Sequence, residues 1–406
     1  MVMHYNLDAI ITQKDVRFIL CALQDRGYQA FVVGGAVRNA LLDIPASDVD
    51  ICTDAIPDVV TRVFEGLRHK VIPTGITHGT VSVVSSGTPY EITTFRRDVS
   101  TDGRRATVAF SSSISDDAER RDFTMNALYL DMDGKIHDPS GQGIADASDR
   151  YLRFIGNPDR RIQEDALRIL RYFRLNATLD FSDDSAPRHA DDNDARRTAM
   201  SCRIEMLDQI SRERVGSEMR KLLGARSCVN ALKSMDAIGA LTTILPSSRL
   251  GKSLVRLEAM ELHLGIAPNW QRRLHVLESD LSLNPMRFSK VEAEYHIKMT
   301  KILMSDITGV ALGYYGGARI GLDAMLLRCA SGHDFCTDEY DMILEGSAAK
   351  FPLRASDLPR DLQGSQIGAA LRECETRWVI SGFSLTLPEM LIDFASGSRQ
   401  ETILFQ

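Results

Sequence analysis

The stretch FVVGGAVRNALLDIPASDVDI, residues 31–51, decides the fold of this chain. Its apolar start is typical of a short buried strand, and paired glycines then lead into a segment with helical periodicity. Alternation of apolar and polar residues predicts a second strand over 47–53, on which side chains two residues apart share one face. Asp48 and Asp50 therefore point the same way. Two such carboxylates repel each other unless a cation lies between them, and hard oxygen ligands favour magnesium, so we expect both to be catalytic metal ligands.

The paired glycines, Gly34 and Gly35, stand where the expected strand ends and the helix begins. Glycine lets a phosphate come close to the backbone, and a helix N-terminus offers free N–H groups and a partial positive charge. Arg38 follows on the first turn of that helix, within reach of a triphosphate. A pair of aspartates alone is weak evidence, because surface strands often carry one. The combination of the two aspartates with the paired-glycine turn favours a nucleotide site that includes Gly34, Gly35 and Arg38.

A third carboxylate, Glu91, lies in the segment YEITTF (90–95), which also alternates like a strand. On a strand beside the two aspartates, Glu91 would complete the metal site as a catalytic residue. An ordinary glutamate at the edge of the sheet fits the same pattern. The sequence leaves both interpretations open.

The composition is that of an ordinary globular protein: 406 residues, 44% hydrophobic and 25% charged, with a net charge of −7. The negative charge argues mildly against a nucleic-acid partner, because phosphate binding needs positive surface. Arginines nevertheless cluster between 96 and 121 and again between 150 and 174, with no lysine in either stretch. Seven scattered cysteines without a CxxC pair argue against a disulfide framework or a zinc site. The N-terminus lacks the plan of a signal peptide, and no window is apolar enough to span a membrane, so we expect a cytoplasmic protein.

Two kinds of pattern divide the chain. Up to about residue 140 short β-rich runs alternate with helical segments, whereas almost every segment after Gly156 has helical periodicity. This predicts an α+β protein with a catalytic head over 1–150, a helical neck over 151–225, and a helical body and tail over 226–406. The acid-rich segment 180–200 is expected to be a loop between helices.

Four motifs occur in an order and spacing that resemble one family. They are similar to the motifs of the class II tRNA nucleotidyltransferases and bacterial poly(A) polymerases, within the DNA polymerase β superfamily. The resemblance implies a polymerase-β-like nucleotidyltransferase head followed by an all-helical neck, body and tail. The first motif departs from the family pattern GGxVRDxLLG, with Asn39 in place of Asp and Asp43 in place of Gly. The motifs are GGAVRNALLDIPASDVDI (34–51), RRDFTMNAL (120–128), EDALRILRYFRL (164–175) and ISRERVGSEMRKLL (210–223).

The second motif implies ribose recognition by Arg121 and Asp122, with Asn126 of the same motif in the nucleotide site. A carboxylate and a guanidinium together suit a 2′-hydroxyl, which is both donor and acceptor. Asp122 is also a good residue for starting a helix, and the two roles are compatible.

The third motif is similar to the base-selecting motif of the family. Asp165 and Arg168 are three residues apart on an expected helix, so they are neighbours, one accepting and the other donating hydrogen bonds. Cytosine and adenine both present an amino donor beside a ring-nitrogen acceptor, whereas uracil and guanine present the reverse. One such pair therefore selects C and A without a template, since a wrong base leaves buried polar groups unpaired at about 1–3 kcal/mol each. Arg171, further along the helix, is expected to fix the pair or hold a phosphate, and Arg174 is a further candidate for the nucleotide site.

These motifs predict template-independent addition of CCA to tRNA 3′ ends from CTP and ATP, with Mg²⁺ as cofactor and pyrophosphate as product. Three alternatives stay open: a bacterial poly(A) polymerase, an A-adding tRNA nucleotidyltransferase, and a catalytically inactive RNA-binding relative. The acidic composition favours CCA addition over poly(A) addition, because the polymerases tend to carry a basic tail. The oligomeric state, the tRNA-contacting residues and the way addition ends are left open.

Overall fold

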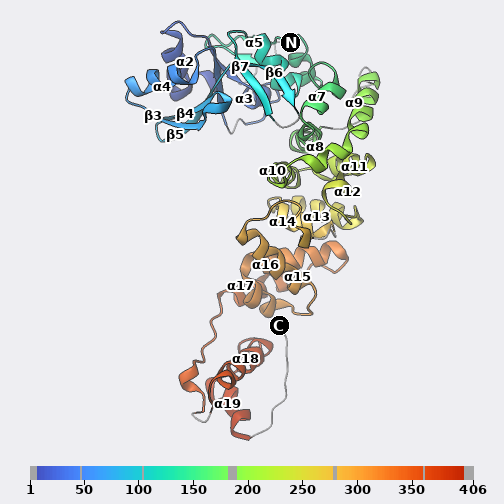
Figure 1. Cartoon of the computed structure of the whole chain (residues 1–406). Coiled ribbons are helices and arrows are strands. Elements are labelled where there is room, and N and C mark those ends of the chain that lie inside the picture. Colours follow the sequence, from blue (N-terminus) through green and yellow to red (C-terminus); the bar gives the residue numbers. More distant parts are fainter. Residues whose placement is uncertain are drawn as a thin grey trace. The chain divides into compact units, whose positions relative to one another are not determined.

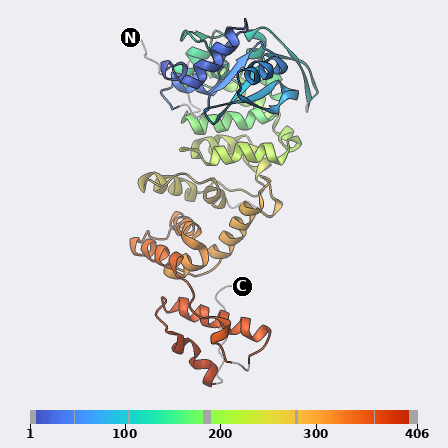
Figure 2. The same cartoon turned by 90° about the vertical axis from the view of Figure 1, so that its left-hand side faces the viewer.

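The computed structural model describes residues 7–45, 48–102, 105–181, 190–277, 281–359 and 362–396. The chain divides into two compact units, Met1–Ile244 and Leu245–Gln406. Every described strand belongs to the first unit, and the described elements of the second are helices (Figures 1 and 2). This arrangement confirms the predicted α+β class. The predicted head and neck boundaries at 150 and 225 both fall inside the first unit and stay predictions.

A seven-stranded sheet forms the centre of the first unit, in the order β3–β4–β5–β2–β1–β8–β9. Strand β1 runs antiparallel to both β2 and β8, while β2 runs parallel to β5. A separate hairpin pairs β6 with β7 (Figure 1). The strands are β1 Ala30–Val33, β2 Asp50–Thr53, β3 Lys70–Gly75, β4 Thr80–Ser85, β5 Thr88–Thr94, β6 Arg96–Asp102, β7 Arg105–Phe110, β8 Tyr129–Leu130 and β9 Ile136–His137.

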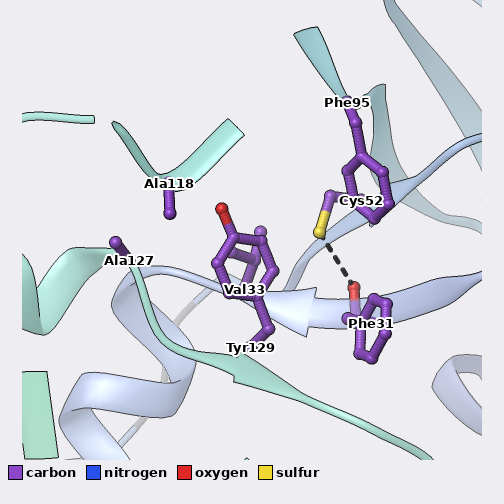
Figure 3. Close-up of a cluster of buried hydrophobic side chains, with 7 residues drawn as sticks. All are labelled: Phe31, Val33, Cys52, Phe95, Ala118, Ala127 and Tyr129. Atoms are coloured by element: carbon purple, nitrogen blue, oxygen red, sulfur yellow. Dashed lines mark hydrogen bonds between the residues drawn. The ribbon is translucent and has the colours of Figure 1, made fainter. Parts of the chain in front are cut away.

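Both faces of the sheet are covered, which corrects one prediction. On one face Phe31 and Val33 pack with Phe95 and Tyr129 in a buried cluster (Figure 3). Helices α2 (Lys14–Gln24) and α4 (Pro57–Gly66) pack against strands of this sheet as well. The predicted strict alternation of apolar and polar residues over 47–53 is therefore wrong. Strand β2 begins only at Asp50, and the three residues that follow Asp50 are all buried. A strand buried on both faces has no polar side to alternate with.

The helices of the first unit include one that replaces a predicted loop. Within the acid-rich segment 180–200, residues 182–189 lie outside the described residues, but α9 begins at Ala190. Asp191 and Asp192 lie in its first turn, where acidic side chains favour the positive end of the helix dipole. The remaining helices are α1 Asp8–Ile11, α3 Gly35–Leu41, α5 Ile114–Glu119, α6 Gly143–Ser148, α7 Pro158–Glu164, α8 Leu167–Leu179, α9 Ala190–Cys202, α10 Arg212–Leu223, α11 Val229–Ala237 and α12 Ala240–Ile244.

The second unit is held together by buried charges as well as apolar packing. Glu261 accepts hydrogen bonds from the guanidinium groups of Arg272 and Arg273, at 2.5–2.9 Å. Arg272 also donates to Asp323 at 2.5 Å, and all four residues are at most 4% exposed. No described helix combines the length and apolar character needed to cross a membrane. The helices are α13 Lys252–His263, α14 Trp270–Val276, α15 Lys290–Leu303, α16 Gly309–Ser331, α17 Thr337–Ala348, α18 Ser365–Ile380 and α19 Leu387–Ser396.

Helices α16 and α17 approach each other closely enough to require glycine at the contact. A Cβ atom added to Gly313 would lie 2.0 Å from the carbonyl oxygen of Ile343, and one added to Gly346 would lie 2.0 Å from that of Val310. Both neighbours are backbone atoms, so no side-chain rotation can relieve the overlap.

We expect Gly313→Ala to destabilise the second unit by about 1–3 kcal/mol or more, because the two helices must separate to admit the methyl group. Thermal unfolding followed by calorimetry checks this. Gly368→Ala in α18 is the matched control, since its new Cβ would meet only the flexible end of Arg372 at 3.4 Å. Alanine has the higher helix propensity, so the control should unfold at the same or a slightly higher temperature. Equal midpoints for the two variants would contradict the close contact.

Candidate active site

The turn between β1 and α3 brings a buried arginine to the edge of the sheet. Gly34 has a φ of 78°, which residues with a side chain rarely adopt, and it leads directly into α3. Arg38, on α3, is only 8% exposed. Its Nη1 donates to the side-chain oxygen of Asn126 at 2.5 Å, while Nε and Nη2 donate to that of Asn39 at 3.1 and 2.8 Å. Burial, together with the nearby charges of Arg174 and Arg171, lowers the pKa of Arg38 to about 10.

The backbone two residues beyond the end of α3 explains one departure from the family pattern. Asp43 has a φ of 55°, in the left-handed region where the pattern has glycine. Aspartate is among the few residues with a side chain that tolerate this conformation. The turn is therefore kept without glycine.

Asp122 lies at the centre of a chain of hydrogen bonds that joins α3 to α8. Its Oδ2 accepts from Nε and Nη2 of Arg171 on α8, at 2.7 and 2.5 Å. Its Oδ1 accepts from the side-chain amide of Asn126 at 3.0 Å, and Asn126 in turn accepts from Arg38. Burial alone would raise the pKa of Asp122, but the charge of Arg171 and these hydrogen bonds outweigh it and hold the pKa at about 2. Asp122 is therefore ionised at neutral pH.

Arg121 has partners of its own, although it is adjacent to Asp122 in the chain. Its Nε and Nη2 donate to Asp117 at 3.0 and 2.8 Å, and its guanidinium lies 5.4 Å from the centre of the Tyr129 ring. A Cβ on Gly34 would lie 3.7 Å from Nη1 of Arg121, so this arginine lies over the glycine turn. Burial alone would raise the pKa of Asp117, but Arg121 and Arg120 hold it below its ordinary value.

The candidate metal ligands lie at the start of β2 and beside it on β5. Ile51 of β2 pairs with Ile92 of β5 in a parallel register, so Asp50 and Glu91 share the opposite face of neighbouring strands. Partial burial raises the pKa of Asp50, and the negative charges of Glu91 and Asp48 raise it further, against the opposing charge of Arg121. Asp48 precedes the strand, so the pleat does not by itself orient it as predicted. Asp48 and Glu91 are therefore each close enough to Asp50 to repel it electrostatically.

The donor set suits a hard divalent cation, although it is not a closed cage. Among the described residues, no three or more His, Cys, Asp and Glu side chains are arranged to hold a metal ion together. Magnesium commonly takes only one or two protein carboxylates and completes its shell with water and substrate phosphates. Mutually repelling carboxylates such as Asp48 and Asp50 fit this pattern. The idea that Glu91 completes a three-ligand site finds no support in this geometry.

Asp165 and Arg168 do not form the neighbouring pair that helical spacing predicts. The helix is interrupted: α7 ends at Glu164, Asp165 is extended with φ −155° and ψ 102°, and α8 begins at Leu167. Asp165 therefore caps α8 through a hydrogen bond from the Leu167 N–H at 3.1 Å. The i,i+3 rule fails because it requires both residues to lie on one continuous helix.

Each of the two residues has partners elsewhere. The second carboxylate oxygen of Asp165 accepts from Arg214 of α10 at 2.7 Å. Arg168 donates through Nη1 to Glu164 at 2.8 Å and to the Arg161 carbonyl at 2.6 Å, and through Nη2 to the Arg120 carbonyl at 3.0 Å. These bonds hold the Arg168 guanidinium in place. The guanidinium of Arg168 does not bond to the side chain of Asp165, so neither side chain is the hydrogen-bond partner of the other.

The two later arginines of α8 also differ from the prediction. Arg171 pairs with Asp122 rather than with Asp165 or Arg168. Arg174 pairs with Glu218 of α10 at 2.5 Å. Both still face the same cavity as the residues above.

A cavity of about 560 Å³ within the first unit brings these residues together. Its walls carry eight arginines and three aspartates, in contrast to the negative charge of the whole chain. Asp48 and Glu91 are the two predicted site residues that do not line it. The lining residues are Gly34, Gly35, Arg38, Asp50, Arg96, Arg120, Arg121, Asp122, Asn126, Asp165, Leu167, Arg168, Arg171, Arg174 and Arg214.

Sequence reasoning did not assign Arg96, Arg120 and Arg214 to the site. Arg96 was visible only as a member of an arginine-rich stretch, whereas Arg120 begins the second motif and Arg214 lies in the fourth. Arg214 reaches the cavity because α10 packs against α8, a contact between segments about 45 residues apart that no local pattern reveals.

Comparisons with known proteins agree with this geometry. Residues 30–153 match the poly A polymerase head domain. CCA-adding enzymes from two Streptococcus pyogenes strains, of serotypes M5 and M3, are each 41% identical over 224 residues, covering 55% of this chain and 52% of theirs. The alignment thus spans about half the length of these curated relatives.

Solved structures extend the likeness to most of the chain. The crystal structure of the Bacillus stearothermophilus CCA-adding enzyme in complex with CTP has a TM-score of 0.71 and 29% identity, covering 90% of this chain and 92% of that one. The Thermotoga maritima CCA-adding enzyme complexed with tRNA has a TM-score of 0.65 and covers 96% of this chain, but at 17% identity it supports the fold alone.

Proposed function

We propose that this chain, which carries the poly A polymerase head domain in residues 30–153, adds CCA to the 3′ ends of tRNA from CTP and ATP. The terminal hydroxyl of the tRNA attacks the α-phosphate of the bound nucleotide, and pyrophosphate leaves. One observation carries the proposal: Asp50 of the proposed head and Asp165 and Arg168 of the proposed neck line the same cavity. Chemistry at the phosphate and choice of base would thus take place on one bound nucleotide.

The charge of the cavity supports a triphosphate as its ligand. Eight arginines against three aspartates leave a positive site in a negatively charged chain. Guanidinium groups form paired hydrogen bonds with phosphate oxygens. Most of the arginines that line the cavity are already held in place by protein contacts. The similar Bacillus stearothermophilus enzyme, which was crystallised with CTP, supports the same ligand class.

Nucleotidyltransferases depend in general on a divalent metal ion, and we propose that in this chain it is Mg²⁺ held by Asp48 and Asp50. The ion, when bound, lowers the pKa of the attacking hydroxyl and stabilises negative charge on the leaving pyrophosphate. Arg38, Arg121 and their neighbours then orient the triphosphate. Positioning of this kind supplies much of the rate in phosphoryl and nucleotidyl transfer.

We propose that Asp165 and Arg168 select the base by binding neighbouring groups on its Watson–Crick edge. Asp165 accepts from the amino group of cytosine or adenine, and Arg168 donates to the adjacent ring nitrogen. Because the side chains of the two residues do not bond to each other, both keep capacity for the base. Uracil and guanine would place a carbonyl against Asp165 and an N–H against Arg168.

Arg168→Ala is expected to relax base choice, raising UMP incorporation relative to CMP by about tenfold or more, since an unpaired buried group costs about 1–3 kcal/mol. Single-nucleotide incorporation with CTP and with UTP measures the ratio. Arg160→Ala is the control, because Arg160 on α7 has an 80% exposed side chain and lies outside the cavity lining. Unchanged rejection of UTP by a folded Arg168→Ala protein would contradict the base-selecting role of Arg168.

Incubation with tRNA lacking its CCA end, with CTP and ATP supplied separately and together, tests the proposed function. Addition of C, C and then A supports it. A long A tail indicates a poly(A) polymerase, and addition of A alone to tRNA ending in CC indicates an A-adding enzyme. RNA binding without incorporation indicates the inactive relative.

The remaining parts of the chain are assigned by the same proposal. Residues 151–225 form the neck that presents the base-selecting residues, and residues 226–406 form a body and tail that bind the tRNA. We propose that the protein acts in the cytoplasm, where its substrates are.

A further inference from the structure

Arg38 differs from most arginines of the cavity in its partners. Six of the eight are ion-paired: Arg120 and Arg121 with Asp117, and the others with Glu164, Asp122, Glu218 and Asp165. Arg38 instead donates three hydrogen bonds to two neutral amide oxygens, those of Asn39 and Asn126. No carboxylate among the described residues pairs with it.

A buried cation without an ion pair of its own is energetically unusual. Arg38 is 8% exposed, and the positive charges of Arg174 and Arg171 act on it, opposed by the negative charge of Asp122, which is itself paired with Arg171. A buried charge without an opposite partner costs free energy, which an anionic ligand would return on binding. The hydrogen bonds that Arg38 donates to Asn39 and Asn126 fix the direction of the guanidinium without forming an ion pair.

Asn39 is the residue that decides whether the charge of Arg38 is neutralised. Its side-chain oxygen accepts two of the three hydrogen bonds, and its side-chain N–H₂ donates to the Pro45 carbonyl at 3.4 Å, in the loop that leads to Asp48. An aspartate, the residue of the family pattern at this position, would accept the same two bonds but would neutralise Arg38. It would also face the Pro45 carbonyl with an oxygen that cannot donate.

Resting on the proposed function, we propose that Asn39 is a positioning residue for the triphosphate: it orients Arg38 without neutralising it, and so strengthens binding of the nucleotide's phosphates. The effect acts on the part of the substrate that CTP and ATP share. It therefore changes the affinity for both nucleotides equally and leaves base choice untouched.

Asn39→Asp, which changes one amide to a carboxylate, is the decisive variant. We expect the dissociation constant for inorganic tripolyphosphate, measured by calorimetry, to rise by about tenfold when one nearby positive charge is neutralised. The KM values for CTP and ATP should rise together by a similar factor. The kcat should change much less, because the candidate metal ligands are untouched.

Two further variants separate charge from structure. Asn39→Ala removes the acceptor but adds no charge, so it should weaken tripolyphosphate binding less than Asn39→Asp does. Gln163→Glu on α7 makes the same change of charge at an exposed residue outside the cavity lining, and it should bind like the wild type. A purely structural role for Asn39 predicts the reverse order, since aspartate keeps both hydrogen bonds to Arg38 and alanine loses them.

The outcomes for this inference and for the proposed function are distinct. Equal tripolyphosphate affinity in the wild type and Asn39→Asp, weaker binding by Asn39→Ala than by Asn39→Asp, or no binding by the wild type, each overturns the inference. A wild type that incorporates no nucleotide into tRNA contradicts the proposed function, while the tripolyphosphate comparison still decides the role of Asn39.

Discussion

Asp50→Asn is expected to reduce incorporation of both CMP and AMP by about a thousandfold or more, because it removes a negative ligand from the metal ion that we propose activates the attacking hydroxyl. The side chain keeps its size and position at the start of β2, where Asp50 lines the nucleotide cavity. Asp48→Ala should cause a similar loss. Primer-extension assays with each nucleotide, alongside tRNA binding measured separately, check that the loss is in chemistry and not in RNA affinity.

Two comparisons sharpen this prediction. Asp54→Asn, just after β2, is the control, since Asp54 accepts a hydrogen bond from the Gln29 backbone and lies outside the cavity lining. It should retain activity near that of the wild type. Glu91→Gln decides the open interpretation of Glu91: a loss as large as that of Asp50→Asn makes it catalytic, and a small loss makes it a strand-edge residue. Substantial activity in Asp50→Asn and Asp48→Ala would remove the metal assignment.

The second large effect is expected from Glu261→Ala in the second unit. This change removes the carboxylate that pairs with both buried arginines, Arg272 and Arg273, whereas the pair of Arg272 with Asp323 remains. Removing one partner of a buried ion pair typically costs about 3–5 kcal/mol, because the other charge is left unpaired away from water. We therefore expect the second unit to unfold at a markedly lower temperature or urea concentration, followed by calorimetry or circular dichroism.

A surface glutamate of the same unit provides the control. Glu294 pairs with Lys290 across 4.0 Å on α15, with both side chains well exposed, so Glu294→Ala should shift the unfolding midpoint little. CTP binding should survive Glu261→Ala at temperatures where the first unit is folded, because no residue lining the cavity belongs to the second unit. Similar midpoints for the two variants would show that the buried network contributes little to stability.

Local patterns were sufficient for the features that depend on neighbours in the chain. The glycine turn, the strand before it and the helix carrying Arg38 all follow from residues within one short stretch. The head-domain match confirms the family resemblance drawn from the motifs. The α+β class likewise follows from the change of periodicity after the head. In each case the controlling interactions are between residues close in sequence, which composition and spacing record directly.

The partners of the site residues, in contrast, came only from the tertiary structure. The break in the helix at Asp165 separates it from Arg168, and Arg171 turns to Asp122, 49 residues earlier in the chain. Likewise, Asn126 completes the hydrogen bonding of Arg38 across 88 residues. Spacing in the sequence predicted most of the charged side chains that line the cavity, but not Arg96, Arg120 and Arg214. Which carboxylate neutralises which arginine, and which arginine is left for the substrate, depends on the packing of segments distant in sequence, where electrostatic energy is set by distance and burial.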